Sequence, residues 1–106
     1  MKQLKLFAIL SVGILFFCNS CKKDTVTTDS LYVPAMMDVT AGATLAELQQ
    51  GRILYENSCG ACHGLYSPDT YSASNWKSIL SIMAPRAGLS QTNTNLVKKY
   101  VCRGKQ

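Results

Sequence analysis

Two cysteines and the only histidine of this 106-residue chain lie within five consecutive positions, CGACH at residues 59–63. Three kinds of site use such a pattern: a redox dithiol, part of a zinc site, and the C-x-x-C-H signature of covalent haem attachment. Only the third uses Cys59, Cys62 and His63 together. The choice among them decides what fills the core of so short a chain, so this motif constrains the fold more than any other feature of the sequence.

The N-terminal residues indicate the compartment in which the motif acts. Two lysines precede an apolar run at residues 6–17, which is shorter than the roughly 20 residues that a membrane-spanning helix needs. Residues 1–20 are therefore interpreted as an export signal. The following CNSC sequence resembles the lipobox of bacterial lipoproteins, which implies that Cys21 becomes a lipid-modified first residue. Modification of Cys18, or an uncleaved signal anchor, is the alternative, and in each case we expect an exported, membrane-anchored protein on the periplasmic side.

The charge of the chain gives no support to nucleic-acid binding. Loss of residues 1–20 removes two lysines and no acidic residue, which lowers the formal net charge from +5 to +3. The densest basic features are the pairs at residues 22–23 and 98–99, which are far smaller than the basic patch of a nucleic-acid interface. We expect the membrane as one partner.

Residues 21–43 are predicted to form a flexible tether. They are rich in Thr, Asp and small residues and show neither helical nor strand periodicity. A flexible chain of this length spans on the order of 25 Å r.m.s., enough to let a domain swivel above a bilayer. The exception is the apolar stretch LYVPAMM at residues 31–37, in which Pro34 disfavours a helix. We expect this stretch to lie against the domain or against a partner.

Residues 44–106 are predicted to form one small all-α domain. Its helices are expected over residues 44–58, 74–82 and 90–102. Thr44 and the glutamate three positions later form a capping box at the first helix, Pro85 ends the second, and Ser90 is the N-cap of the third. No stretch alternates with a period of two for long enough to form a sheet.

The small size of this domain favours the haem interpretation of the motif. A domain of about 60 residues usually needs a staple, and a haem bound by two thioethers would be both staple and core. A thioredoxin-type dithiol would require a βαβ pattern, which the sequence lacks, and a zinc site would require Cys102 as its fourth ligand. In the haem interpretation, Cys59 and Cys62 bond to the two vinyl groups and His63 ligates the iron.

Four features follow one another along the domain: GRILYENSCGACHG at residues 51–64, a helix with a tryptophan, MAPRAGLS at residues 83–90, and a closing helix with a tyrosine. This pattern, which covers residues 44–103, resembles the monohaem class I c-type cytochromes. The resemblance implies a small cytochrome c-like fold whose helices wrap around a covalently bound haem. Two departures are a very short connection between His63 and the next helix and the lack of a longer glycine-rich loop after the motif.

The resemblance also implies where the helices cross. In that family the first helix crosses the last through a glycine and an aromatic residue, which here match Gly51 and Tyr55 against Tyr100. A close approach of two helices explains a glycine that otherwise costs about 1 kcal/mol inside a helix.

Met83 is the predicted second axial ligand. Because His63 is the only histidine, bis-histidine ligation within the chain is excluded. Met83 follows His63 by 20 residues and lies where the resemblance implies a methionine loop. A thioether binds haem iron well and raises its reduction potential, whereas the alternative is that Met83 fills the core.

Three further residues are expected near the haem. Pro68 resembles the family's proline whose carbonyl accepts a hydrogen bond from the ligating histidine. The indole N–H of Trp76 could donate to a haem propionate, although such a tryptophan is often simply core. Arg86 either pairs with a propionate or is solvated.

The expected function is one-electron transfer by a lipid-anchored monohaem c-type cytochrome, with one covalent haem c, between membrane-side redox partners. No nucleophile–base pair, carboxylate pair or phosphate loop suggests an enzyme, and no small-molecule substrate is expected. If Met83 does not bind iron, the alternative is a haem-based ligand sensor or a small peroxidase-like enzyme with an open coordination site. A third possibility is a tethered subunit of one oxidase or dehydrogenase. Cys102 is expected to be a buried thiol or a site of intermolecular pairing.

Overall fold

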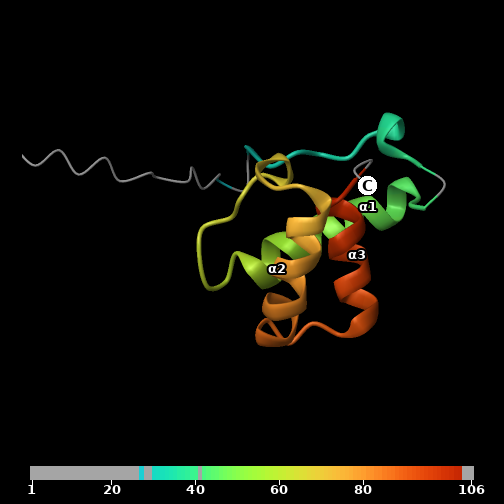
Figure 1. Ribbon diagram of the computed structural model, residues 1–106. Helices are drawn as coiled ribbons and strands as arrows, with labels where there is room; N and C mark the ends of the chain where they lie inside the picture. Colours follow the sequence, from blue (N-terminus) through green and yellow to red (C-terminus); the bar gives the residue numbers. More distant parts are fainter. Residues whose placement is uncertain (1–26, 28–29, 41, 104–106) are drawn as a thin grey trace, which may run out of the picture.

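The computed structural model describes residues 27, 30–40 and 42–103 (Figure 1). The predicted export signal, with Cys18 and Cys21, lies outside these residues. The described part contains three α-helices: α1 at Leu45–Leu54, α2 at Ala73–Arg86 and α3 at Gln91–Val101. Shorter helical turns are η2 at Met36–Asp38, η3 at Tyr55–Cys59 and η4 at Pro68–Thr70.

The prediction of an all-α domain is confirmed for the described residues, which contain no strand beyond one isolated bridge between Thr40 and Ala43. α3 packs against both α1 and α2. The core between the helices consists of Leu31, Tyr55, Leu65, Trp76, Leu80, Val97, Tyr100 and Val101. Among the described residues, we find no helix of the length and apolar character required to span a membrane.

α1 begins at the predicted capping box. The Thr44 hydroxyl accepts a hydrogen bond from the Glu47 N–H at 3.3 Å, and the Glu47 carboxylate accepts one from the Thr44 N–H at 2.9 Å. Both bonds satisfy N–H groups that the start of a helix leaves without a partner. Lys99 on α3 also donates to the Glu47 carboxylate, at 2.6 Å. The same carboxylate therefore caps α1 and ties it to α3.

The predicted crossing of α1 and α3 at Gly51 is confirmed. A Cβ atom added to Gly51 would collide with the backbone carbonyl of Leu96 and would lie 3.0 Å from the Cβ of Tyr100. One turn further along, the rings of Tyr55 and Tyr100 lie with their centroids 5.9 Å apart. The two backbones can approach this closely only because Gly51 has no side chain.

α2 is longer than predicted, because it continues through Pro85 instead of ending before it. Proline lacks an N–H and so removes one intrahelical hydrogen bond, but here it occupies the last turn. A Schellman motif closes that turn: the Leu89 N–H donates to the Ala84 carbonyl at 3.0 Å and the Gly88 N–H to the Pro85 carbonyl at 3.1 Å. Gly88 adopts the φ of 66° that the motif requires. Met83 consequently lies within a helix and not in a loop.

Residues 30–40, here called the strap, pack against the helices, which is one of the two arrangements expected for the apolar stretch at residues 31–37. Leu31 is 3% exposed and belongs to the core, and Pro34 is buried. The Tyr100 hydroxyl donates to the Tyr32 carbonyl at 2.8 Å. These contacts form because the apolar side chains of the strap cover a face of the domain that would otherwise meet water. The packed domain therefore begins at Leu31 instead of Thr44.

Arg103, just beyond α3, joins the strap to η4. Its guanidinium carbon lies 3.8 Å from the centre of the Tyr32 ring, and its nitrogens lie 3.9 Å from the Asp38 carboxylate and 3.0 Å from that of Asp69. The Arg103 side chain is only 8% exposed. A cation–π contact and two ion pairs thus connect three separate segments.

Candidate functional site

An apolar pocket of about 210 Å³ lies between α2, η3 and the loop that follows the motif. One face of α2 lines it with Trp76, Ile79, Leu80 and Met83, which recur at helical spacing. The other lining residues are Tyr55, Cys59, His63, Tyr66 and Tyr71. The pocket therefore combines an aromatic wall with the start and the end of the motif.

The motif is presented by a π-helical turn. α1 was expected to continue as a regular helix to residue 58, but the chain widens into η3 at Tyr55–Cys59. π-Helical turns are rare and frequently occur at functional sites. Immediately after this turn, a Cβ atom on Gly60 would collide with the Glu56 carbonyl. Gly60, the glycine of the motif, thus allows the chain to leave the helix sharply.

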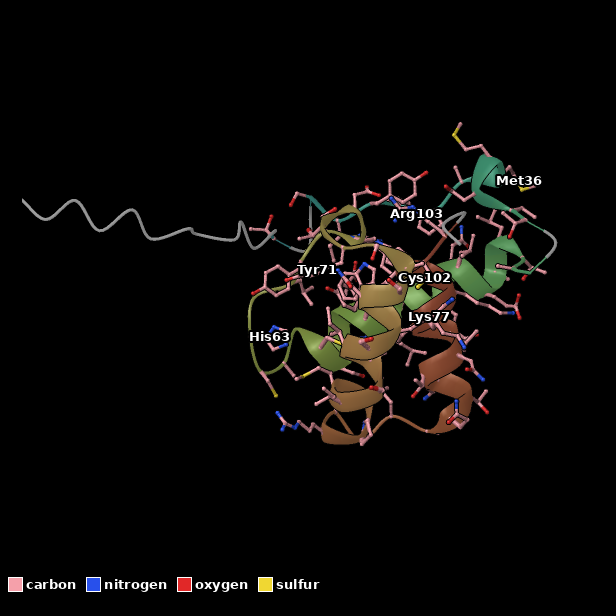
Figure 2. All side chains as sticks on the ribbon, viewed as in Figure 1. Met36, His63, Tyr71, Lys77, Cys102 and Arg103 are labelled. Carbon is pink, nitrogen blue, oxygen red and sulfur yellow. The ribbon has the colours of Figure 1, made fainter. Side chains whose placement is uncertain are left out.

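The three residues of the motif differ in exposure. Cys59 is half-buried and lines the pocket, whereas Cys62 and His63 are exposed. The Nδ1 atom of His63 lies 2.8 Å from the Gly64 carbonyl, a pairing in which Nδ1 donates and which leaves Nε2 free to act as a ligand. Figure 2 shows His63 on the loop at the edge of the domain.

Two buried aromatic residues hold the loop that follows His63. The Tyr55 hydroxyl donates to the Tyr66 carbonyl at 2.8 Å and accepts from the Tyr66 N–H at 3.2 Å. The Trp76 indole N–H donates to the Pro68 carbonyl at 2.8 Å. Tyr55 and Trp76 also contact each other edge to face, with centroids 5.9 Å apart. The two side chains form a clamp that fixes residues 66–68 against the core.

These hydrogen bonds differ from the expected ones. In this structure the Pro68 carbonyl accepts from Trp76, and His63 pairs with Gly64. The Trp76 N–H, for which a propionate was one of two alternatives, thus donates to the protein backbone, and Trp76 is part of the core. η4 packs so that the Pro68 carbonyl meets α2, where the buried indole N–H needs an acceptor.

A second hollow, of about 270 Å³, adjoins the first and shares part of its lining. Its lining consists of Ser58, Cys59, Cys62, His63, Met83, Arg86 and Ala87. Cys59, His63 and Met83 border both hollows. The structure therefore brings together, around one space, four residues that the sequence predicted as ligands or attachment points. Arg86, expected either to pair with a propionate or to be solvated, lines the second hollow.

Burial raises the pKa of the Cys59 thiol, and the neighbouring charge of Cys62 raises it further. Cys59, Cys62 and Cys102 form no disulfide with one another. The Cys102 sulfur lies 3.8 Å from the carbonyl of Ala73, at the start of α2, and Figure 2 shows it well apart from His63. Within the described residues, no three His, Cys, Asp or Glu side chains gather as metal ligands. The structure thus does not bring Cys102 to the motif as a fourth zinc ligand.

The groups around the two hollows are two thiols, one imidazole and one thioether, set beside an apolar, aromatic wall. This donor set suits a planar apolar cofactor with a metal at its centre, because soft sulfur and imidazole ligands bind iron and the apolar wall can pack against a flat ring. Sequence reasoning missed Tyr66, Tyr71 and Ile79 as lining residues. The helical spacing from Trp76 to Met83 was a signal that could have identified Ile79 and Leu80.

Comparisons of the chain with protein-family models, curated proteins and solved structures gave no match. Any assignment of function therefore depends on the motif and on the geometry around it.

Proposed function

We propose that this protein is a monohaem c-type cytochrome that carries single electrons between redox proteins at the outer face of a membrane. The observation that carries the proposal is that Cys59, His63 and Met83 border one apolar space formed by two adjoining hollows. Attachment residues, a proximal ligand and a distal ligand are thereby available around a single cofactor position.

The motif residues would hold the haem from one side. Cys59 and Cys62 would supply the two thiols for thioether bonds, and His63 would supply its Nε2, since its Nδ1 donates to the Gly64 carbonyl. A bound haem would supply a reversible one-electron iron couple. The clamp formed by Tyr55 and Trp76 keeps residues 66–68 fixed, which limits movement of the neighbouring His63 segment.

Met83 would close the other side of the iron. Its sulfur is carried by a helix whose same face includes Trp76 and Leu80, both 4% exposed or less, so its position is set by packing. With His63 and Met83 both as ligands, a bound haem would exchange electrons and would offer no open position to a substrate. For this reason we propose an electron carrier and not an enzyme.

The proposal includes membrane attachment. The lipobox-like sequence at residues 18–21 supports a lipid anchor at Cys21 on the periplasmic side. Redox proteins at or near that membrane would be the partners.

Expression beside a c-type maturation system tests haem attachment. The purified protein should show the absorption bands of a c-type haem and should retain haem on a denaturing gel. Cys59→Ala and Cys62→Ala should each weaken or abolish that retention, because each removes one thioether. Cys102→Ala is the matched control, since its sulfur lies away from the motif against Ala73, and should retain haem fully. A wild-type band without haem would refute the proposal.

A further inference from the structure

The strap presents four apolar side chains to solvent. Met36 and Met37, on η2, are 71% and 86% exposed, and Val33 and Val39 on either side are 60% and 40% exposed. Figure 2 shows Met36 directed outward from this turn. Single exposed apolar residues are ordinary, but a group of them on one short segment marks a contact surface.

The turn that carries the methionines is built by specific bonds. The Asp38 carboxylate accepts hydrogen bonds from the Ala35 N–H at 2.8 Å and from the Tyr32 hydroxyl at 2.7 Å. Arg103 stacks on the Tyr32 ring and faces Asp38. The exposure of Met36 and Met37 thus belongs to an ordered element, held on the domain by its polar residues.

We propose that this apolar face of the strap rests on the lipid surface to which the domain is anchored. The inference depends on the proposed lipid anchor at Cys21. Leu31, where the packed domain begins, follows Cys21 by ten residues, and ten residues reach at most about 36 Å when fully extended and about 17 Å r.m.s. when flexible. The anchor therefore keeps the strap close to the bilayer.

The charges beside the strap favour a lipid surface. Lys77 and Lys98 are exposed and line the same groove as Asp38 and Thr40 of the strap. Lysines near a bilayer are attracted by anionic headgroups. The one carboxylate of this groove that could oppose them, Asp38, is already bonded to Tyr32 and close to Arg103.

The size of the surface also favours lipid over a protein partner. A stable protein interface uses roughly 20–30 residues on each side, whereas the apolar face of the strap is four side chains on seven residues. Shallow insertion of a few apolar side chains is the usual way in which interfacial segments bind membranes.

This contact would orient the domain. In Figure 1 the strap and the C-terminal turn of α2 lie at opposite ends of the folded part. That turn carries Arg86, which lines the hollow beside Cys62 and Met83. With the strap on the bilayer, this hollow faces the aqueous space, where a redox partner can reach it.

The test places a fluorescent reporter on the strap. Full-length protein carrying Met37→Trp is purified with its anchor and reconstituted into vesicles of phosphatidylcholine and phosphatidylglycerol (3:1), with and without brominated acyl chains. Because Met37 is 86% exposed, the substitution leaves packing intact. Ile82→Trp is the matched control, at a position 54% exposed on α2. The parent protein, whose only indole is the buried Trp76, supplies the background.

Brominated lipid should quench the Met37→Trp signal at least about twofold, as expected for a side chain at the acyl boundary, and should leave the Ile82→Trp signal unchanged. Equal signals in both vesicles for an anchored Met37→Trp protein would overturn the orientation alone. If the Met37→Trp fluorescence instead changed with the amount of protein per vesicle and not with bromination, the strap would contact a second copy of the chain. This result would also overturn the proposed orientation. A chain that mass spectrometry shows to be unlipidated, and that does not bind vesicles, would overturn anchor and orientation together. The haem proposal is judged separately, from the absorption spectrum.

Discussion

Met83 is the residue on which the distinction between electron carrier and ligand binder depends. It is half-buried, lies on α2 one residue before the buried Ala84, and borders both hollows beside the motif. A methionine there is suited to two roles, core filler and iron ligand, and both need the same apolar surroundings. The two roles differ in what happens to the iron when the sulfur is removed.

Met83→Ala should open the sixth coordination position. We expect the reduced variant to bind carbon monoxide quickly, to lose the near-infrared sulfur-to-iron band, and to fall in potential by on the order of 100 mV, within the roughly 0.8 V that axial ligands control. Ile82→Ala, at the exposed neighbouring position, is the control and should change none of these. A wild-type protein that already binds carbon monoxide rapidly would instead favour a haem-based sensor or a peroxidase-like enzyme.

The Tyr55 hydroxyl offers a second test at the scale of one residue. Tyr55→Phe removes an oxygen that pairs with both the carbonyl and the N–H of Tyr66. We expect the free energy of unfolding to fall by about 1–3 kcal/mol, because both backbone groups lose their partner. Urea unfolding measures the change. Tyr66→Phe, which removes a hydroxyl from a half-buried ring, is the comparison, and an equal loss there would show that the clamp contributes nothing particular.

At the scale of the helices, the link between α1 and α3 is electrostatic as well as apolar. Hydrogen bonds from Lys99 and from the Thr44 backbone lower the pKa of Glu47 to about 2 from its ordinary value of 4.5. A carboxyl group with a lowered pKa in the folded state stabilises the fold above its unfolded pKa, and this contribution is lost as the pH falls toward the folded pKa. The link should therefore weaken between about pH 4.5 and pH 2.

Glu47→Gln should expose this dependence. The variant should melt at a lower temperature than the wild type at pH 7, and the difference between them should shrink as the pH is lowered from 4.5 to 2. Thermal unfolding followed by circular dichroism over that range measures it. Because the pair is partly exposed, added salt should also reduce the difference at pH 7. A constant difference at all pH values would contradict the assignment of the ion pair.

Which elements could be predicted from the sequence depends on how local their causes are. The starts of α1 and α3 were predictable because Thr44 and Ser90 cap helices through bonds within three residues. The end of α2 was not, because a Schellman motif after Pro85 overrides the usual effect of proline. The π-helical turn also has no local signal: its first residue, Tyr55, is bonded to Tyr66, eleven positions later.

The site follows the same rule. Cys59, Cys62 and His63 could be singled out from the sequence because they lie within five consecutive positions in a recognisable C-x-x-C-H pattern. The hydrogen bond from Trp76 to Pro68 was not foreseen, because it depends on how η4 packs against α2. Tyr66 and Tyr71 lie in the connection between helices, so no helical spacing marks them in the sequence. Their place in the pocket lining depends on how this connection packs against the helices.

For the molecule as a whole, the strap changes where the domain begins. Leu31 is part of the core, the Tyr32 carbonyl accepts from Tyr100, and Asp38 lies beside Arg103. A domain cut at Thr44 would lack all of these. The buried Tyr100 hydroxyl and the Arg103 guanidinium, which is 8% exposed, would each lose a partner from the strap. If the domain begins at residue 31, a fragment that starts at residue 44 should be less stable than a longer one. If it begins at residue 44, the two fragments should be equally stable.

The two boundaries can be distinguished by comparing the unfolding of two exported fragments that contain the same amount of cofactor per chain. The free energy of unfolding should be larger for a fragment that starts at Thr27 than for one that starts at Thr44. The expected difference is about 2–5 kcal/mol, the usual cost of losing one buried leucine side chain. The longer fragment should also have the larger urea dependence, because more surface is exposed when it unfolds. Met37→Ala in the longer fragment is the control, and should leave the midpoint unchanged because Met37 is 86% exposed. Equal midpoints and slopes for the two fragments would mean that residues 31–38 contribute nothing to the fold, and would contradict the packing boundary at residue 31.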